Sequence, residues 1–277
     1  MFRKHRKLLI ITGSIFLVAI IVGIFVKSVI DPDSTPTVVS EVKQDVAPNK
    51  IFESYKYRYD LQIIHSNAKL YSAPAGTKGA NYLGTAKTRH LSANIVGQKR
   101  CDLNNMRRVG YIAFKQAGHQ YWISAQNVKF RDLNKFKGTN PKIETAINAG
   151  LKLVGKSKYD YGGGRNLSDI KNHHFDCSSF IRYCYGKAGI RLGRMDNITT
   201  YTLVTMGKPV KFQDMKRGDI FFFTNSKGQV NSHVALYLGD HLFLHDHNQS
   251  DTGGVGISTL NAPGWLKETN GTVRRIA

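Results

Sequence analysis

The residues best suited to covalent chemistry are one cysteine and two histidines that follow it in the chain. Cys177 stands at the start of a predicted helix, His233 follows 56 residues later at the start of a predicted strand, and His245 lies on the next strand. A thiol beside a histidine is the arrangement that a cysteine nucleophile requires, because the imidazole can take the thiol proton. A helix N-terminus and a neighbouring imidazolium can also lower the pKa of a thiol from its ordinary value of about 8.5. We therefore predict a thiol–imidazole pair with a depressed thiol pKa.

The helix that must position Cys177 is predicted from its cap and its apolar spacing. Asp176 is a good N-cap residue, which places the thiol in the first turn, where unpaired N–H groups and the helix dipole favour an anion. Apolar residues then recur at three- and four-residue spacing up to Gly189, a helix stop, namely Phe180, Ile181, Cys184, Tyr185 and Ala188. An isolated cysteine is more often a small buried hydrophobic residue, which is our interpretation of Cys184.

The two histidines fall on a predicted β-hairpin, residues 233–247, with Gly-Asp at its bend. If the loop is 239–241, Leu238 pairs with Leu242 and His233 lies opposite His247. His245 is then on the same face, one diagonal away, and the other face carries Val234, Leu236, Leu242 and Leu244. An even loop length would reverse this parity. His245 or His247 would fix the tautomer of the His233 imidazole.

Zinc is the alternative use of clustered histidines. Among Cys177, His233, His245 and His247 the only close-spaced pair is His245 and His247, and no cysteine pair lies nearby, so we expect no metal.

Three further segments are predicted around this centre. A helix begins near Pro141, ends at Gly155, and has one apolar face made by Ile143, Ala146, Ile147, Leu151 and Val154. The glycine-rich turn 159–164 lacks the Lys-Ser/Thr of a phosphate loop, so it indicates close approach of the backbone to a neighbour or a substrate. The run Arg217-Gly218-Asp219 is interpreted as a turn before an apolar strand.

The N-terminal segment is predicted to be a membrane anchor. Residues 8–26 carry no charge for 19 positions, close to the ~20 residues that cross a bilayer as a helix. The basic residues within 3–7 would keep the N-terminus cytoplasmic. A cleaved signal peptide is the alternative, but the apolar run is long for one and no small-x-small site follows it. We expect residues 1–30 to be a cytoplasmic basic head and transmembrane anchor, and residues 31–50 a proline-containing linker.

The charge of the chain then identifies a class of partner. The formal net charge is +21, and five of the 40 basic residues flank the apolar run, which leaves 35 basic against 19 acidic residues, or +16, for the remainder. Nucleic acid is the usual partner of such a surface. The anchor places this part outside the cytoplasm, so we expect anionic cell-wall polymers and no nucleic acid.

Residues 51–132 have the short alternating runs, broken by Gly, Pro and Asn, of a small all-β barrel or sandwich. The closing pattern, 118–130, resembles the last strands of bacterial Src-homology-3-like wall-binding domains, and a structural spacer is the alternative. Three cysteines are too few for a disulfide framework, and the sequence names no partner for Cys101.

The motifs of residues 143–277 resemble, as a set, the NlpC-type family of papain-like cysteine peptidases, which cut bacterial peptidoglycan stem peptides. The matching pieces occur in the family's order and are Tyr159–Gly163, Asp176–Phe180, Gly218-Asp219, His233–Tyr237 and His245. The resemblance implies an α+β fold for residues 141–277, with N-terminal helices packed on an antiparallel sheet. It also implies Cys177 as the nucleophile, His233 as the base, His245 as the orienting third residue, and no cofactor.

The resemblance further implies a substrate, the amide between γ-D-glutamate and the diamino acid of the stem peptide. Tyr159, Asp176 and Ser178 are expected to contact it. Two departures from the family pattern, Ser179 in place of glycine and the Asp-His after His245, are expected to alter the pocket without removing a catalytic group. The alternatives are an amidase cutting the glycan–peptide junction, an acyltransferase of the same superfamily, and a non-catalytic wall-binding protein. A histidine as third residue favours the endopeptidase.

Overall fold

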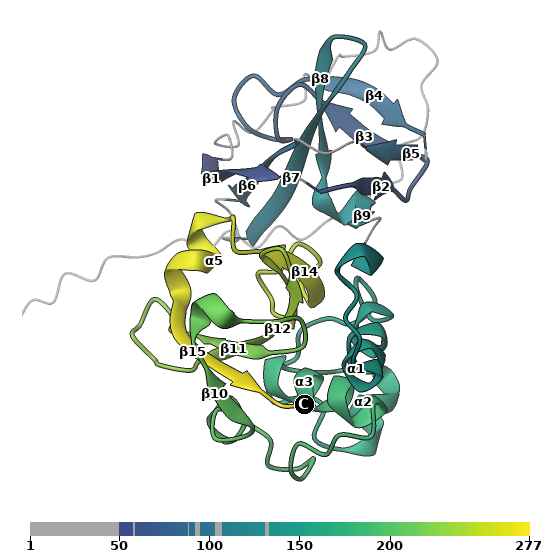
Figure 1. Cartoon of the computed structure of the whole chain (residues 1–277). Helices are drawn as coiled ribbons and strands as arrows, with labels where there is room; N and C mark the ends of the chain where they lie inside the picture. Colours follow the sequence, from purple (N-terminus) through teal and green to yellow (C-terminus); the bar gives the residue numbers. More distant parts are fainter. Residues whose placement is uncertain (1–49, 58, 88, 92–94, 103–106, 131–132) are drawn as a thin grey trace, which may run out of the picture. The chain divides into compact units, whose positions relative to one another are not determined.

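The computed structural model describes residues 50–277 apart from 58, 88, 92–94, 103–106 and 131–132 (Figure 1). The predicted anchor, and the linker up to residue 49, lie outside the described residues. No helix of the described part is both long and apolar enough to span a membrane.

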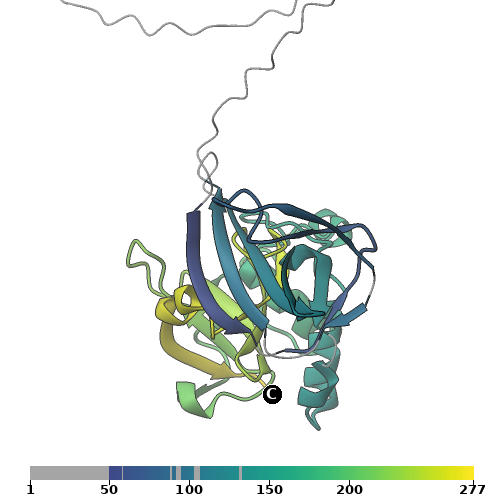
Figure 2. The same ribbon diagram turned by 90° about the horizontal axis from the view of Figure 1, so that it is seen from above.

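Residues 50–130 form the all-β structure that their alternating runs predict. The described strands make a six-stranded antiparallel sheet in the order β1-β6-β7-β8-β3-β4 and a three-stranded sheet in the order β5-β2-β9. In the view from above, the purple and blue strands of the larger sheet run side by side and curve (Figure 2). The strands are β1 (Lys50–Tyr57), β2 (Leu61–Ile63), β3 (Ala68–Tyr71), β4 (Tyr82–Ala86), β5 (Arg89–Leu91), β6 (Ile95–Asp102), β7 (Arg107–Gln116), β8 (His119–Ser124) and β9 (Val128–Phe130).

Residues 208–275 contribute another six-stranded antiparallel sheet, in the order β10-β15-β11-β12-β13-β14. Its central strands are buried almost throughout, because side chains pack on both faces; the predicted apolar strand, 220–223, is fully buried. The strands are β10 (Lys208–Val210), β11 (Ile220–Phe223), β12 (His233–Gly239), β13 (Leu242–Asp246), β14 (Val255–Thr259) and β15 (Thr269–Arg275).

Helices α1 (Pro141–Leu151) and α3 (Cys177–Lys187) pack against each other and against β13, and together with this sheet they make the predicted α+β arrangement (Figure 1). Shorter helices are α2 (Leu167–Asn172), α4 (Thr200–Leu203) and α5 (Pro263–Glu268), with 3-10 turns η1 (Ala125–Asn127), η2 (Leu133–Phe136) and η3 (Phe212–Asp214).

Helix α1 begins where it is predicted to begin and ends earlier. Asn140 caps it by accepting hydrogen bonds from the N–H groups of Lys142 (3.1 Å) and Ile143 (3.3 Å). The predicted end at Gly155 is wrong, because the helix stops at Leu151. The reason is tertiary: the N–H of Gly155 donates to the Val255 carbonyl at 3.0 Å, so the chain has already left the helix to meet β14.

One glycine sets how closely α1 approaches its neighbours. A Cβ atom built on Gly150 would lie 2.6 Å from Cδ2 of Leu244, 2.8 Å from Sγ of Cys184 and 2.9 Å from Cζ of Phe180. Helix α1, helix α3 and strand β13 therefore meet at a position where only a hydrogen fits. The contact also shows that Leu244 faces the helices, as the predicted parity requires.

The hairpin of β12 and β13 has the predicted register but a different turn. The predicted pairing of Leu238 with Leu242 is wrong, because Leu242 pairs with Gly239; further from the turn Leu236 pairs with Leu244, as the predicted register implies. The predicted three-residue loop is wrong: Gly239 pairs with Leu242, and the loop is Asp240-His241, both with positive φ (50° and 64°). An irregularity between residues 237 and 239 inserts one residue in the ladder, and this restores the parity that an even loop would reverse.

The Arg-Gly-Asp run is used internally, as its interpretation as a turn predicts. Arg217 makes a bidentate pair with Glu144 (2.7 and 2.8 Å), and Asp219 pairs with Arg275 (2.7 Å). Burial alone would raise the pKa of the Glu144 carboxyl, but hydrogen bonds from Arg217 and Gly138 lower it. The pair ties α1 to the turn before β11.

Candidate active site

Cys177 is the first residue of helix α3, at the position that its predicted cap assigns. Oδ1 of Asp176 accepts hydrogen bonds from the N–H of Ser179 and the hydroxyl of Ser178, both at 2.9 Å. Ser179 Oγ in turn accepts from the N–H of Asp176 at 3.0 Å, which completes a capping box. Further along the helix Cys184 is fully buried, as predicted.

The same first turn explains Ser179, which stands where the family usually has glycine. Gly164, with φ of +77°, lies so close that an added Cβ would be 2.5 Å from Ser179 Oγ. The glycine-rich turn thus approaches a neighbouring segment, as predicted, and leaves room for the hydroxyl that caps α3.

A cavity of about 470 Å³ opens in front of Cys177. The three residues predicted to contact substrate, Tyr159, Asp176 and Ser178, all line it together with the thiol-bearing residue. The other lining residues are Tyr161, Gly162, Arg165, Thr199, Thr200, Tyr201, Asn225, Gln229 and Ser232. None of these others was predicted as a site residue, because they come from three separate segments and share no local pattern.

The two histidines form a hydrogen-bonded chain at the sheet side of the site. Nε2 of His233 and Nδ1 of His245 lie 3.0 Å apart, and Nε2 of His245 lies 3.0 Å from Oγ of Ser258. Ser232, which precedes His233, reaches the cavity wall. His247 lies across from the pair, with its ring centroid 4.7 Å from that of His233. Ser258, the third group in this series of hydrogen bonds, was not predicted from the sequence, because only the pairing of β13 with β14 brings it beside His245.

The charge states differ from the predicted ones. Burial raises the pKa of the Cys177 thiol to about 12, the Asp176 carboxylate adds to the rise, and hydrogen bonds from the N–H groups of Val234 and Ser178 oppose it. Burial, together with His247 and His245, lowers the pKa of His233 well below its ordinary value. The prediction of a depressed thiol pKa is wrong, because burial outweighs the helix N-terminus. The Cys177 thiol and the His233 imidazole are therefore both neutral at rest.

Asp246, the residue after His245, is a fully buried acid. Neither of its carboxyl oxygens has a hydrogen-bond partner among the described residues. Burial raises its pKa to about 8, with the Asp176 and Asp160 carboxylates adding to the rise. Asp246 is therefore a protonated acid at neutral pH, on the same face of β13 as Leu244.

Comparison with known proteins gives the family. Residues 155–274 match the model of the NlpC/P60 family. The chain is also 32% identical, over 119 residues, to a probable endopeptidase of Haemophilus influenzae; the aligned part covers 42% of this chain and 70% of that protein. The chain belongs to the NlpC/P60 family.

Two other relatives of the NlpC/P60 part carry more specific names. Peptidoglycan DL-endopeptidase CwlO of Bacillus licheniformis is 46% identical over 134 residues, which cover 48% of this chain and 28% of that protein. Murein DD-endopeptidase MepS/Murein LD-carboxypeptidase of Escherichia coli is 34% identical over 119 residues, which cover 42% of this chain and 58% of that protein. The chain thus spans well under two thirds of the length of both. The NlpC/P60 match includes every candidate site residue and leaves out residues 50–154.

Proposed function

We propose that the protein is a cell-wall hydrolase, a cysteine peptidase that cleaves peptidoglycan stem peptides between γ-D-glutamate and the diamino acid. The observation that carries the proposal is the placement of Cys177. It is the first residue of the capped helix α3 and lines a cavity together with Tyr159, Asp176 and Ser178. The names of the relatives, a peptidoglycan DL-endopeptidase and a murein endopeptidase, support the substrate class.

The first step in this proposal is proton transfer from Sγ of Cys177 to His233. Nε2 of His233 already faces His245 (3.0 Å), so Nδ1 is the nitrogen that takes the proton. His245 then accepts from the imidazolium through Nδ1 and donates its own Nε2–H to Ser258 (3.0 Å). Because thiol and imidazole are both neutral at rest, His233 acts as a general base during the attack.

The thiolate attacks the scissile carbonyl, and the carbonyl oxygen becomes an oxyanion. Backbone N–H groups in the first turn of α3, including that of Cys177, are the donors that would stabilise it, because a helix start leaves these groups without partners. His233 returns the proton to the leaving amine, which breaks the amide and leaves a thioester on Cys177. Water then hydrolyses the thioester, so no cofactor enters the reaction.

Digestion of purified peptidoglycan by the full chain tests this reaction. Mass spectrometry of the products should find new diamino-acid amino termini and new γ-D-glutamate carboxyl ends. New L-alanine amino termini would identify an amidase, and transferred peptide an acyltransferase. Sedimentation with the wall without any new ends would identify a non-catalytic binder. Each of these three results would contradict the proposed endopeptidase.

The N-terminal segment completes the proposal. Residues 8–26 would anchor the chain in the cell membrane with the catalytic part outside, facing the wall. A linker of ~20 residues then allows the folded part to stand at most about 60–70 Å from the membrane, at ~3.3–3.6 Å per extended residue. The charge of +16 outside the membrane would hold the enzyme to anionic wall polymers by many screened contacts.

A salt titration of the full chain in detergent tests the electrostatic part. Sedimentation with insoluble wall should weaken steeply as ionic strength rises, whereas cleavage of a soluble muropeptide should change far less, because that chemistry depends on short-range contacts. Wall binding that survives high salt would instead point to a specific site in residues 51–132, as the Src-homology-3-like resemblance suggests.

A further inference from the structure

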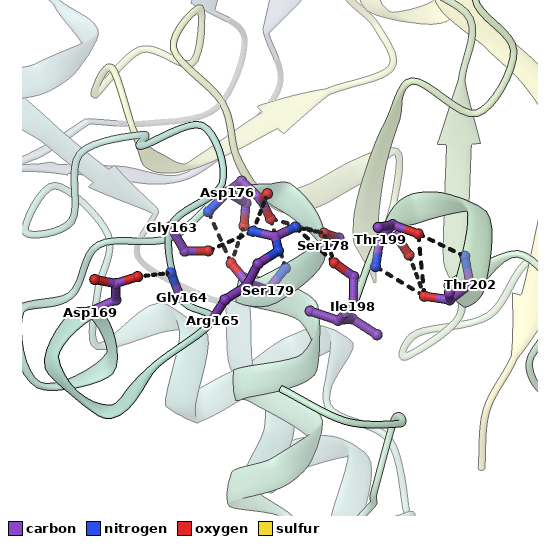
Figure 3. A network of polar contacts seen from close by, with 10 residues as sticks. All are labelled: Gly163, Gly164, Arg165, Asp169, Asp176, Ser178, Ser179, Ile198, Thr199 and Thr202. Atoms are coloured by element: carbon purple, nitrogen blue, oxygen red, sulfur yellow. Dashed lines mark hydrogen bonds and ion pairs between the residues drawn. The ribbon is translucent and has the colours of Figure 1, made fainter. Parts of the chain in front are cut away.

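Arg165 connects the segments that surround the candidate nucleophile (Figure 3). It directly follows the glycine-rich turn, and its side chain lines the cavity and is 23% exposed. Nη1 lies 2.7 Å from Oδ2 of Asp176 and donates to the Gly163 carbonyl at 2.9 Å. Nη2 donates to the Ile198 carbonyl at 2.7 Å and to Ser178 Oγ at 3.4 Å.

These contacts join three separate parts of the cavity wall. Gly163 belongs to the glycine-rich turn, Asp176 and Ser178 to the start of α3, and Ile198 to the segment before α4. A planar guanidinium can serve such divergent acceptors at once, and a lysine ammonium cannot do so in the same geometry. The role is therefore more specific than that of a surface ion pair.

We propose that Arg165 is a positioning residue of the reaction, whose guanidinium balances the Asp176 carboxylate beside Cys177 and fixes the first turn of α3 against the cavity walls. The inference rests on the proposed function, in which Cys177 is the nucleophile. Neither the cap of α3 nor the cavity would by itself require an arginine at position 165, and the proposal gives this residue a role.

The electrostatic argument follows from the groups that face the thiol. Burial raises the pKa of Cys177 most, the Asp176 carboxylate at the N-cap of α3 comes next, and Asp246 on β13 adds to the rise only when it is ionised. Burial also raises the pKa of the Tyr159 hydroxyl, and His233 is neutral. The Asp176 side chain is 8% exposed, so water screens it poorly. Without Arg165 its negative charge would act fully on the sulfur, and forming the thiolate would become harder.

A solvent-exposed ion pair provides the matched control. Arg194 and Asp196 also form a short ion pair (2.6 Å), but their side chains are 78% and 56% exposed and neither residue lines the cavity. Removing Arg194 takes away the same formal charge from a solvated site, where a salt bridge contributes little.

The experiment measures alkylation of Cys177 by iodoacetamide as a function of pH, in the full chain. Trypsin releases residues 172–182, a peptide in which Cys177 is the only cysteine, so mass spectrometry follows this thiol alone. Arg165→Gln should shift the alkylation curve to higher pH by about one unit, equivalent to about tenfold slower reaction at a fixed pH. Arg165→Lys keeps the charge but loses the divergent contacts, so its curve should lie between those of Arg165→Gln and the wild type. Arg194→Gln should leave the curve near that of the wild type.

Asp176→Asn in the Arg165→Gln background separates the charge effect from a loss of structure. Asparagine still caps a helix, and it removes the charge that Arg165 balances, so the curve should return to within about threefold of the wild type at each pH. An unchanged curve in Arg165→Gln, or no rescue in the double variant, would overturn the proposal. Failure of the endopeptidase proposal would be seen separately, as a normal alkylation series in a protein that releases no new peptidoglycan ends.

Discussion

Two carboxyl groups near the candidate nucleophile are kept from adding an unbalanced negative charge in two different ways. On the helix side, Asp176 accepts hydrogen bonds from Ser178 and Ser179 and pairs with Arg165 at 2.7 Å. On the sheet side, Asp246 has no hydrogen-bond partner in the described part of the chain and keeps its proton up to about pH 8. Either device avoids an unbalanced charge beside the thiol. One uses a fixed cation, which pH hardly affects, and the other uses a proton, which pH can remove.

The largest expected effect lies within the helix side. Cys177→Ala should abolish cleavage of peptidoglycan, a loss of at least about a thousandfold, because the acyl acceptor is gone. Cys184→Ala, on the same helix but in the apolar core, should keep its activity and lose some stability, because it removes packing rather than chemistry. A turbidity assay on purified wall compares the two, and equal behaviour would refute the assignment of the nucleophile.

On the sheet side, His233→Ala should be as damaging as Cys177→Ala, because residues that act as one unit are not additive in their effects. The matched measurement is alkylation of Cys177 in His233→Ala, which reports whether the thiol remains accessible when the base is removed. A variant that retains a tenth or more of wild-type activity would exclude His233 as the general base.

The rest of the histidine chain should contribute less. His245→Ala should leave a measurable remnant, since its loss should cost less than the roughly 100- to 10,000-fold that a general base itself contributes. Ser258→Ala, one hydrogen bond further out, should cost less again. His247→Ala is the comparison variant, and if it proved more harmful than His245→Ala, the orienting role would belong to His247.

The last prediction concerns stability, without an effect on the reaction itself. The pH dependence of the free energy of unfolding tests whether Asp246, unlike Asp176, is protonated in the folded protein. Asp246 loses its proton near pH 3.8 when unfolded and near pH 8 when folded, so its stabilising contribution is complete below pH 3.8 and is lost as the pH rises toward 8. Asp246→Asn cannot ionise. Between pH 5 and 8 the free energy of unfolding of the wild type should therefore fall relative to that of Asp246→Asn, by at most about 1.4 kcal/mol per pH unit.

Urea unfolding at pH 5, 6, 7 and 8 measures this difference. Parallel curves for the wild type and Asp246→Asn would show that Asp246 is ionised throughout, and the contrast with Asp176 would then be lost.

What the sequence predicted, it predicted through local rules. Asp176 as a cap, Pro141 at a helix start and the shared face of His233 and His245 all depend on residues close in the chain. The register survived an incorrect loop, since the irregularity at Leu238 offset it. The misses depend on contacts outside a single predicted element or hairpin: Ile198 lies 33 positions from Arg165 in an irregular segment, and Ser258 lies on β14, a strand that was not predicted to pair with β13. The thiol pKa was wrong for the same reason, because burial belongs to the whole fold.

Gly150 has a consequence for how precisely the Cys177 thiol is placed relative to the His233 imidazole. Because it has no side chain, α1 can lie in direct contact with α3 and β13 at this position. A methyl group there would act as a wedge that pushes α3 away from β13, and Cys177 would travel with its helix. The alignment of sulfur and imidazole would then drift although no polar atom had been touched. The position of the Cys177 sulfur thus depends on the absence of a Cβ atom at Gly150, which contacts α3 at Cys184, about ten ångströms along the helix from Cys177.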